Sequence, residues 1–189
     1  MDPARASHPI GILPLGEVPA IAPKVIAAHI SGYLNLRAVL LPPMNLPVQA
    51  LDKSRLQYNA AHLIQQLESR PINSVEKIIA VFSVDLFLPV FTHVFGEARQ
   101  GGRVALVSLF RLKKDVAAER QPSSITLERA AKVALHELCH LFNLTHCENQ
   151  DCLMHFSGDL EALDHLPLSF CRYCRSFLRD AVGRHFRRG

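Results

Sequence analysis

Apolar residues recur along the chain in two patterns that predict its secondary structure. Short continuous apolar runs, bounded by proline or glycine, predict strands. These runs are Ile10–Leu13, Leu36–Leu41, Lys77–Leu88, Phe91–Ala98 and Arg103–Leu112. Apolar residues at helical spacing predict helices at Pro19 to Leu34, Ser54–Ser69, Ser124–Phe142, and from near Pro167–Ser169 towards Phe186. The mixed order of elements predicts an α/β (α+β) fold, in which the last two strands form a hairpin.

The chain has the size and composition of one globular domain. It has 189 residues, of which 49% are hydrophobic and 20% charged, which is enough to bury a core without disulfides. We expect one domain over residues 1–189. Its upper part is residues 1–142, and its lower part, residues 143–189, is where cysteines and histidines gather.

Charge and hydropathy exclude some classes of protein. The net charge is +4, and arginines crowd the segment Cys171–Gly189. A solvated face on a terminal helix explains this segment better than a nucleic-acid site does. The sequence shows neither a secretory leader nor a membrane span, so we expect a cytoplasmic protein. Its five cysteines are an odd number, which argues against a disulfide framework and favours metal ligation.

The helix over Ser124–Phe142 ends in the motif His136-Glu137-Leu138-Cys139-His140. Histidines four residues apart lie about 40° apart around a helix, so both imidazoles can reach one zinc ion. Glu137 stands beside the first histidine, where its carboxylate can take a proton from a water on the metal. Two surface histidines on a helix are the plain alternative.

A third histidine, His146, follows six residues after His140. A continued helix would carry His146 to the wrong face, so the chain has to turn back at residue 143. Such a turn needs positive φ, which glycine and then asparagine tolerate best, and Asn143 stands there. Three histidines with this spacing predict a catalytic zinc site.

The segment HELCHLFNLTH resembles the metzincin signature, with Asn143 in the usual glycine position. The match to the archaemetzincin family is closer, because Cys147, Cys152, Met154, Cys171 and Cys174 follow in that family's order. The resemblance implies a metzincin-like domain with a twisted mixed sheet packed on the active-site helix. It also implies that Met154 is the Met-turn residue beneath the zinc, although a core methionine would look the same. Peptidase activity, in an aminopeptidase-like form, is a further implication.

The cysteine spacing, C-x4-C and C-x2-C separated by 18 residues, is typical of a closed structural zinc site. Cys147, Cys152, Cys171 and Cys174 would therefore hold a second zinc and anchor the C-terminal helix beside His146. A disulfide pair is the alternative. Cys139 is left over and is predicted to be a small buried residue. His155 either lines the cleft or is an ordinary satisfied histidine.

The residues favour a zinc metallopeptidase with two zinc ions per chain and a peptide or protein substrate. Glu137 would activate the attacking water, and the substrate would lie along an edge strand, for which Phe95–Arg99 is the candidate. One alternative is a zinc-binding regulatory or peptide-binding protein with negligible turnover. Another is a nucleic-acid-associated zinc module that uses the arginine-rich tail; it is disfavoured because the four cysteines lie within the catalytic motif.

Overall fold

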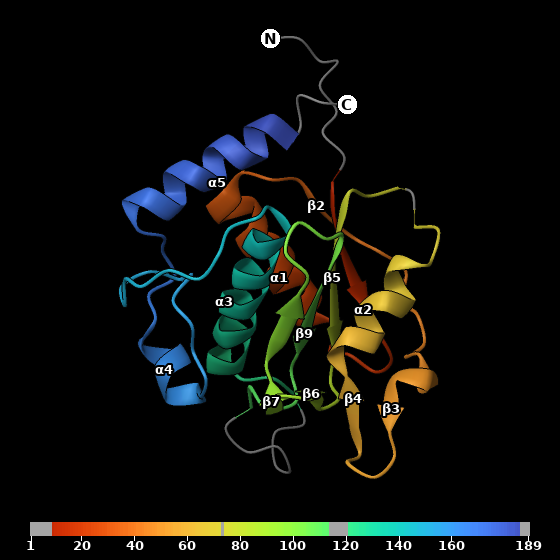
Figure 1. Ribbon diagram of the computed structural model, residues 1–189. Coiled ribbons are helices and arrows are strands. Elements are labelled where there is room, and N and C mark those ends of the chain that lie inside the picture. The colour runs from red at the N-terminus through yellow and green to blue at the C-terminus, as the bar shows by residue number, and fades with distance from the viewer. Residues whose placement is uncertain (1–8, 73, 114–120, 186–189) are drawn as a thin grey trace.

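The computed structural model describes residues 9–72, 74–113 and 121–185, and its centre is a five-stranded mixed sheet (Figure 1). In spatial order the strands are β2 (Ala38–Leu40), β1 (Ile10–Pro14), β5 (Lys77–Phe82), β9 (Val104–Ser108) and β8 (Gly96–Ala98). Neighbours pair in parallel except β8, which is antiparallel to β9 and forms one edge. The hairpin predicted for the last two strands is therefore confirmed, with its turn between β8 and β9.

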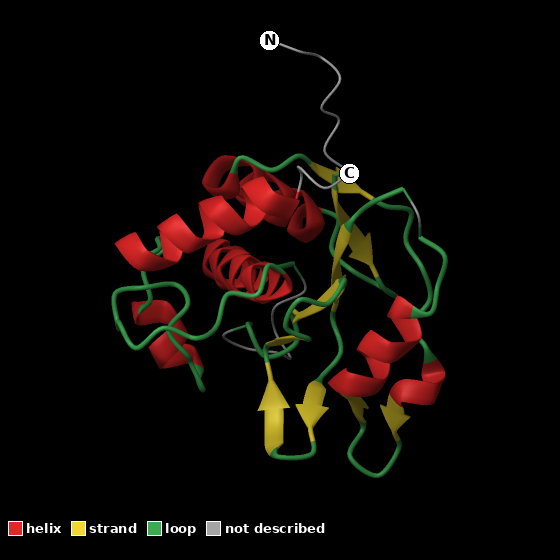
Figure 2. Cartoon of the chain, turned by 45° about the horizontal axis from the view of Figure 1, so that its top comes forward, coloured by secondary structure: helices red, strands yellow, loops and turns green. Residues whose placement is uncertain are grey.

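Helices cover both faces of this sheet. On one face lie α1 (Ile21–Leu34) and α3 (Ser124–Leu141), and on the other lies α2 (Ala60–Glu68), as Figures 1 and 2 show. Side chains of β5 alternate accordingly, because Ile79 and Val81 pack towards α1 and α3 whereas Ile78 and Ala80 pack towards α2. All six residues of β5 are buried, which explains its unbroken apolar run. No described helix has the length and apolar character needed to cross a membrane.

The predicted helix over Ser54–Ser69 is wrong in its first six residues. A 3₁₀ turn, Val48–Ala50, leads into β3 (Leu51–Asp52), which pairs with β4 (Gln57–Asn59). The Asp52 carboxylate holds the intervening turn by accepting hydrogen bonds from the Ser54 amide and hydroxyl. Helix α2 begins only at Ala60, because the Asn59 side chain accepts a hydrogen bond from the His62 amide and caps it.

Two predicted strands are each split in the structure. The run Lys77–Leu88 divides into β5 and β6 (Leu86–Leu88), because the buried Asp85 between them makes a two-pronged ion pair with Arg111. The run Phe91–Ala98 divides into β7 (Phe91–Val94) and β8. Strands β3, β4, β6 and β7 form a second, four-stranded sheet. The split therefore lets β8 lie at the edge of the larger sheet.

The last third of the chain wraps α3 on the side away from the sheet (Figure 1). It contains α4 (Leu160–His165), which the periodicity does not reveal, and α5 (Arg172–His185), which begins a few residues later than predicted. The buried Arg129 of α3 ties α4 in place through two hydrogen bonds to Asp164, of 2.6 and 2.7 Å. The α/β fold with a mixed sheet on the motif helix is thus confirmed, with a C-terminal helix beside a four-cysteine cluster.

We expect Asp164→Asn to lower the free energy of unfolding by about 1–2 kcal/mol, because Arg129 then loses its charged partner while Asp164 itself is partly exposed. The hydrogen bond from Arg129 lowers the pKa of Asp164 below its usual value of about 3.9. The ion pair therefore stabilises the fold above that value, and the contribution is lost as the pH falls through the lowered pKa.

Urea unfolding of wild type and Asp164→Asn at several pH values measures this effect. The difference between them should stay constant near neutral pH and shrink below about pH 4. Asp180→Asn, at an exposed carboxylate on α5, is the matched control and should change little. A difference that is as large at acid pH would show that the ion pair is not its source.

Candidate active site and metal centres

Helix α3 carries the motif residues to one end of a cleft. The Ser123 side chain caps its first turn by accepting a hydrogen bond from the Thr126 amide. The helix ends at Leu141, and Asn143 then has φ of 68°, as the sequence predicted. The β8–β9 turn closes this end, because the Gly101 amide donates to the His140 carbonyl at 2.9 Å. The chain can therefore turn back and bring His146 to the first two histidines.

The three predicted histidines come together. One ring nitrogen from each of His136, His140 and His146 lies within 4.8 Å of the others. His136 Nδ1 donates to the Leu153 carbonyl at 2.8 Å, and His140 Nδ1 donates to the Leu144 carbonyl at 2.6 Å. Because a carbonyl can only accept a hydrogen bond, the proton of each neutral ring is on Nδ1. The Nε2 atom of each ring then has a lone pair that can bind a metal. The two Nε2 atoms are 3.1 Å apart, close to the separation of about 3.3 Å that tetrahedral zinc imposes.

Electrostatics keep these imidazoles uncharged, which metal ligation requires. Burial is the main cause that lowers the pKa of all three histidines, and it lowers the pKa of His136 to about 3. Neighbouring histidines add to the effect at His136. Three neutral lone pairs aimed at one point repel one another unless a cation lies between them. The donor set therefore fits a zinc ion.

Glu137 lies at the floor of the same cleft. Its side chain is 9% exposed, and its carboxylate makes no hydrogen bond or ion pair with the residues that the structure describes. Burial raises the pKa of Glu137 well above its usual value, and the charge of Glu97 adds to this. An acceptor without a partner beside three metal-binding nitrogens is available to a substrate or to a water molecule.

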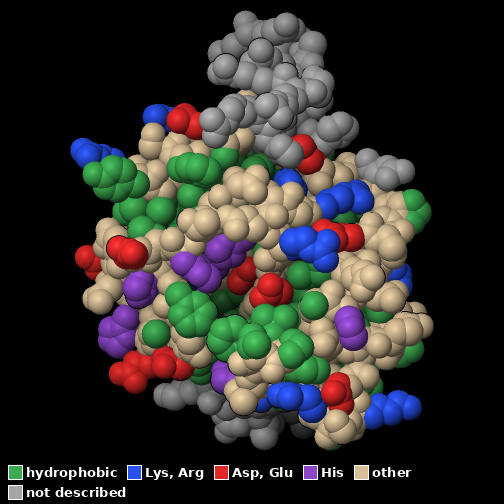
Figure 3. Space-filling model, in the orientation of Figure 1, with side chains coloured by type: hydrophobic (Ala, Val, Ile, Leu, Met, Phe, Trp, Pro, Cys, Tyr) green, Lys and Arg blue, Asp and Glu red, His purple; other side chains and the backbone are tan. Residues whose placement is uncertain are grey.

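The cleft has a volume of about 540 Å³ and lies over α3, between the β7–β8 segment and the loop after Leu153. Figure 3 shows histidine side chains gathered in this hollow, with acidic side chains beside them and an apolar rim below. Phe91 and Phe156 approach each other from opposite walls, with ring centres 6.4 Å apart. Strand β8, within the predicted Phe95–Arg99 segment, forms the edge that faces the cleft.

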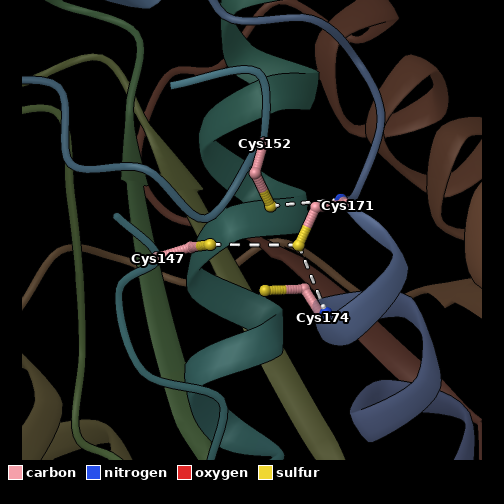
Figure 4. Close-up of side chains that lie close together, drawn as sticks. All are labelled: Cys147, Cys152, Cys171 and Cys174. Atoms are coloured by element: carbon pink, nitrogen blue, oxygen red, sulfur yellow. Dashed lines mark hydrogen bonds between the residues drawn. The ribbon is translucent and has the colours of Figure 1, made fainter. Parts of the chain in front are cut away.

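The four predicted cysteines form a second cluster, in which the Sγ atoms lie within 4.8 Å of one another. Figure 4 shows Cys147 and Cys152, from the loop after α3, pointing towards Cys171 and Cys174 at the start of α5. The Sγ atoms of Cys147 and Cys171 are 3.9 Å apart, close to the value of about 3.8 Å for two thiolates on one zinc. All are free thiols, so the disulfide alternative is wrong. A hydrogen bond from the Cys174 amide is the largest cause that lowers the pKa of Cys171, to about 7.

Backbone hydrogen bonds join the two clusters. His136 donates to the carbonyl of Leu153, the neighbour of Cys152, and the Leu153 amide donates in turn to the Ser169 carbonyl at 2.8 Å. The Cys147 amide donates to the Met154 carbonyl at 2.8 Å, and Cys147 directly follows His146. The cysteine cluster is therefore built into the loop that positions the histidines.

Three further residues lie as the sequence allowed. Met154 is fully buried in the core shared with α3. Cys139 is also fully buried and lies outside the four-cysteine cluster, as predicted. His155 donates Nδ1 to the Cys147 carbonyl at 2.9 Å and does not line the cleft, so it is an ordinary satisfied histidine.

One cleft residue escaped the sequence reasoning. Glu97 of β8 lines the cleft with Glu137, but it has no motif partner at a recognisable spacing. The only available signal was a charged residue inside a strand that was expected at the edge of the sheet.

Comparison with known proteins agrees with this geometry. The model of peptidase family M54 matches residues 27–180, and an archaemetzincin from Pyrococcus furiosus is 32% identical over 94% of this chain and 96% of its own length. The chain belongs to the archaemetzincin family. The crystal structure of archaemetzincin from Methanopyrus kandleri has a TM-score of 0.82 at 32% identity, and the match covers 96% of this chain and 99% of that one. Archaemetzincin from Archaeoglobus fulgidus, complexed with malonate, has a TM-score of 0.77 at 34% identity, with 89% and 98% covered.

Membership in the archaemetzincins makes the chain a zinc metallopeptidase that acts on peptides or proteins. The histidine cluster fits the catalytic zinc of such an enzyme, and the cysteine cluster fits its structural zinc.

Proposed function

We propose that this archaemetzincin hydrolyses peptide bonds in the cleft over α3, with Glu137 as the general base. His136, His140 and His146 would hold the catalytic zinc. The observation that carries the proposal is the convergence of three neutral imidazoles beside a buried carboxylate that has no partner in the described part of the chain. An enzyme of this class needs that combination, because the metal and the base have to act on the same water molecule.

Zinc bound to these histidines would supply a Lewis acid for the peptide carbonyl and would make a nearby water more acidic. Glu137 takes a proton from the attacking water as the new carbon–oxygen bond forms. Glu137 then gives this proton to the leaving nitrogen as the carbon–nitrogen bond breaks. The products are one carboxylic acid and one amine, and Glu137 returns to its ionised form.

Strand β8 would hold the substrate in an extended conformation. The Ser108 amide bonds to the Phe95 carbonyl at 2.8 Å, and Glu97 lies opposite Leu106. The alternation of an antiparallel pair then turns the backbone N–H and C=O groups of Gly96 and Ala98 away from β9, on the edge that faces the cleft. A peptide can add to this edge as a further strand. We further propose that the enzyme cleaves peptides at their amino end, as an aminopeptidase does.

The four cysteines would hold the structural zinc, and Met154 would form the apolar floor of the catalytic site. Because the thiols of a zinc site persist where disulfides do not form, we place the protein in a reducing compartment, the cytoplasm. The arginines in the described part of α5 are exposed, as on an ordinary solvated helix face, and we therefore propose no nucleic-acid partner.

Peptide cleavage by the zinc-loaded chain tests this function. We expect two zinc ions per chain by metal analysis and new fragments, seen by mass spectrometry, from a mixture of peptides. A chelator that empties the histidine site should stop cleavage, and added zinc should restore it. A fully zinc-loaded chain that cleaves no peptide would instead favour the zinc-binding regulatory protein.

A further inference from the structure

Glu97 is a second carboxylate in the cleft and has no role in the mechanism above. It lies on β8 between Gly96 and Ala98, the two residues whose backbone faces the cleft. Among the described residues that line the cleft, Glu97 and Glu137 are the acidic ones. Figure 3 shows the acidic side chains of this hollow beside the histidines.

The Glu97 carboxylate has no partner within the described parts of the chain, although it is partly buried. Other shielded acids do have one: Asp85 is held by Arg111 at 2.7 Å, and Glu68 by Arg99 at 3.0 Å. Burial raises the pKa of Glu97, and its charge in turn raises that of Glu137, so the two groups destabilise each other. The zinc that the histidines would hold offsets the charge of Glu137, its neighbour in the cleft. Glu97, on β8, is then the carboxylate that has room for a second cation from outside.

No lysine or arginine of the described cleft wall is free to supply that cation. Lys132 lines the cleft, but its ammonium group already bonds to the Leu163 and Asp164 carbonyls at 3.2 Å each and to Glu128 at 3.1 Å. The three histidines of the metal site are neutral when they bind zinc. With zinc beside Glu137, Glu97 is the carboxylate left for a charged group of the substrate, and it attracts the amino end of a peptide and repels its carboxylate end.

Glu97 also lies near Glu137, since both line the cleft and the charge of Glu97 raises the pKa of Glu137. A Cβ atom on Gly96 would lie only 2.8 Å from Glu137 Cγ, so β8 packs on α3 through Gly96, and Glu97 is the next residue along this edge strand. The α-amino nitrogen of a peptide is two covalent bonds, about 2.5 Å, from the first carbonyl carbon. We therefore expect an ammonium group this close to the reacting carbon to lie in the part of the cleft that Glu97 lines.

We propose that Glu97 binds the free α-ammonium group of the substrate's first residue and so directs cleavage to the amino end of peptides. This inference rests on the proposed peptidase function, and it adds the residue that distinguishes an amino end from the interior of a chain. The role of Glu97 is specificity. It takes no proton from the water and gives none to the leaving group.

Binding of ligands that are not cleaved tests the role of Glu97 separately from the proposed peptidase activity. Calorimetry on the zinc-loaded protein would compare leucine hydroxamate with N-acetyl-leucine hydroxamate, which lacks the ammonium group. Wild type should bind the free amine about 10- to 100-fold more tightly, the range for a charged hydrogen bond in a shielded site. Glu97→Gln, which keeps size and polarity, should bring the two affinities within about twofold, and Glu97→Asp should keep part of the preference.

Cleavage assays give the second readout. With a peptide and its N-acetylated form, Glu97→Gln should lower kcat/KM for the free peptide by about 10- to 100-fold and leave the acetylated one unchanged. Glu17→Gln, at an exposed carboxylate away from the cleft, should behave as wild type. Zinc content and thermal unfolding should be alike in all of these proteins.

Several results would overturn the inference. Wild type could bind both hydroxamates equally, or Glu97→Gln could keep the preference for the free amine. An equal loss for free and acetylated peptides would show that Glu97 acts only on Glu137. A loss of kcat/KM confined to peptides with a basic first side chain would mean that Glu97 binds that side chain and not the α-ammonium group. If the preference exists but no peptide is cleaved, the proposed function fails while Glu97 still binds amines.

Discussion

Glu137→Gln should lower kcat for peptide cleavage by about 10²–10⁴-fold while both zinc ions remain bound. The substitution keeps the size of the side chain but removes the carboxylate that, in the proposed mechanism, takes a proton from the attacking water and returns it to nitrogen. It also removes a buried charge that has no partner among the described residues, so the fold should be as stable as wild type or more so.

Metal analysis, thermal unfolding and single-substrate kinetics on matched samples measure this result. Glu17→Gln serves as the control for loss of an exposed carboxylate. Unchanged turnover in Glu137→Gln would mean that another group is the base, with Glu97 as the nearest candidate. Loss of one zinc ion would mean that Glu137 has a part in holding the metal.

Cys171→Ser should release the structural zinc and weaken zinc binding at the histidine site by about 10- to 100-fold. Structural zinc contributes its binding energy to folding, so its loss should cost more stability than an ordinary single substitution. The histidine site should respond because Cys152 precedes Leu153, whose carbonyl orients His136. Cys147 likewise follows His146 directly.

Zinc titration with a competing chelator, followed by denaturation, measures both effects. Cys139→Ala is the matched control, because Cys139 is a buried cysteine outside the cluster. It should lose some packing energy but keep two zinc ions. Unchanged affinity at the histidine site, with only α5 released in Cys171→Ser, would show that the two sites are independent.

The sequence by itself determined the residues of both metal sites. The reason is that their geometry is mostly local: helical spacing aligns His136 with His140, and Asn143 supplies the positive φ that returns the chain to His146. Each cysteine pair is local in the same way, whereas the 18 residues between the pairs include α4, so that only the fold brings the two pairs together. The long helices and the buried strand β5 were predictable for a similar reason, because their apolar periods are long and regular. The division of the domain into residues 1–142 and 143–189 stays a prediction.

Tertiary structure decided where apolar runs break and which distant residues meet. Asp85 ends β5 by pairing with Arg111, a partner 26 residues away that no local pattern reveals. The run from Phe91 to Ala98 contributes a strand to each of the two sheets, because β7 pairs with β6 whereas β8 pairs with β9. Glu97 lies near Glu137 only because β8 packs across α3, with glycine at the point of contact. Contacts of this kind depend on packing between segments far apart in the chain. The spacing of residues in a single sequence therefore does not predict them.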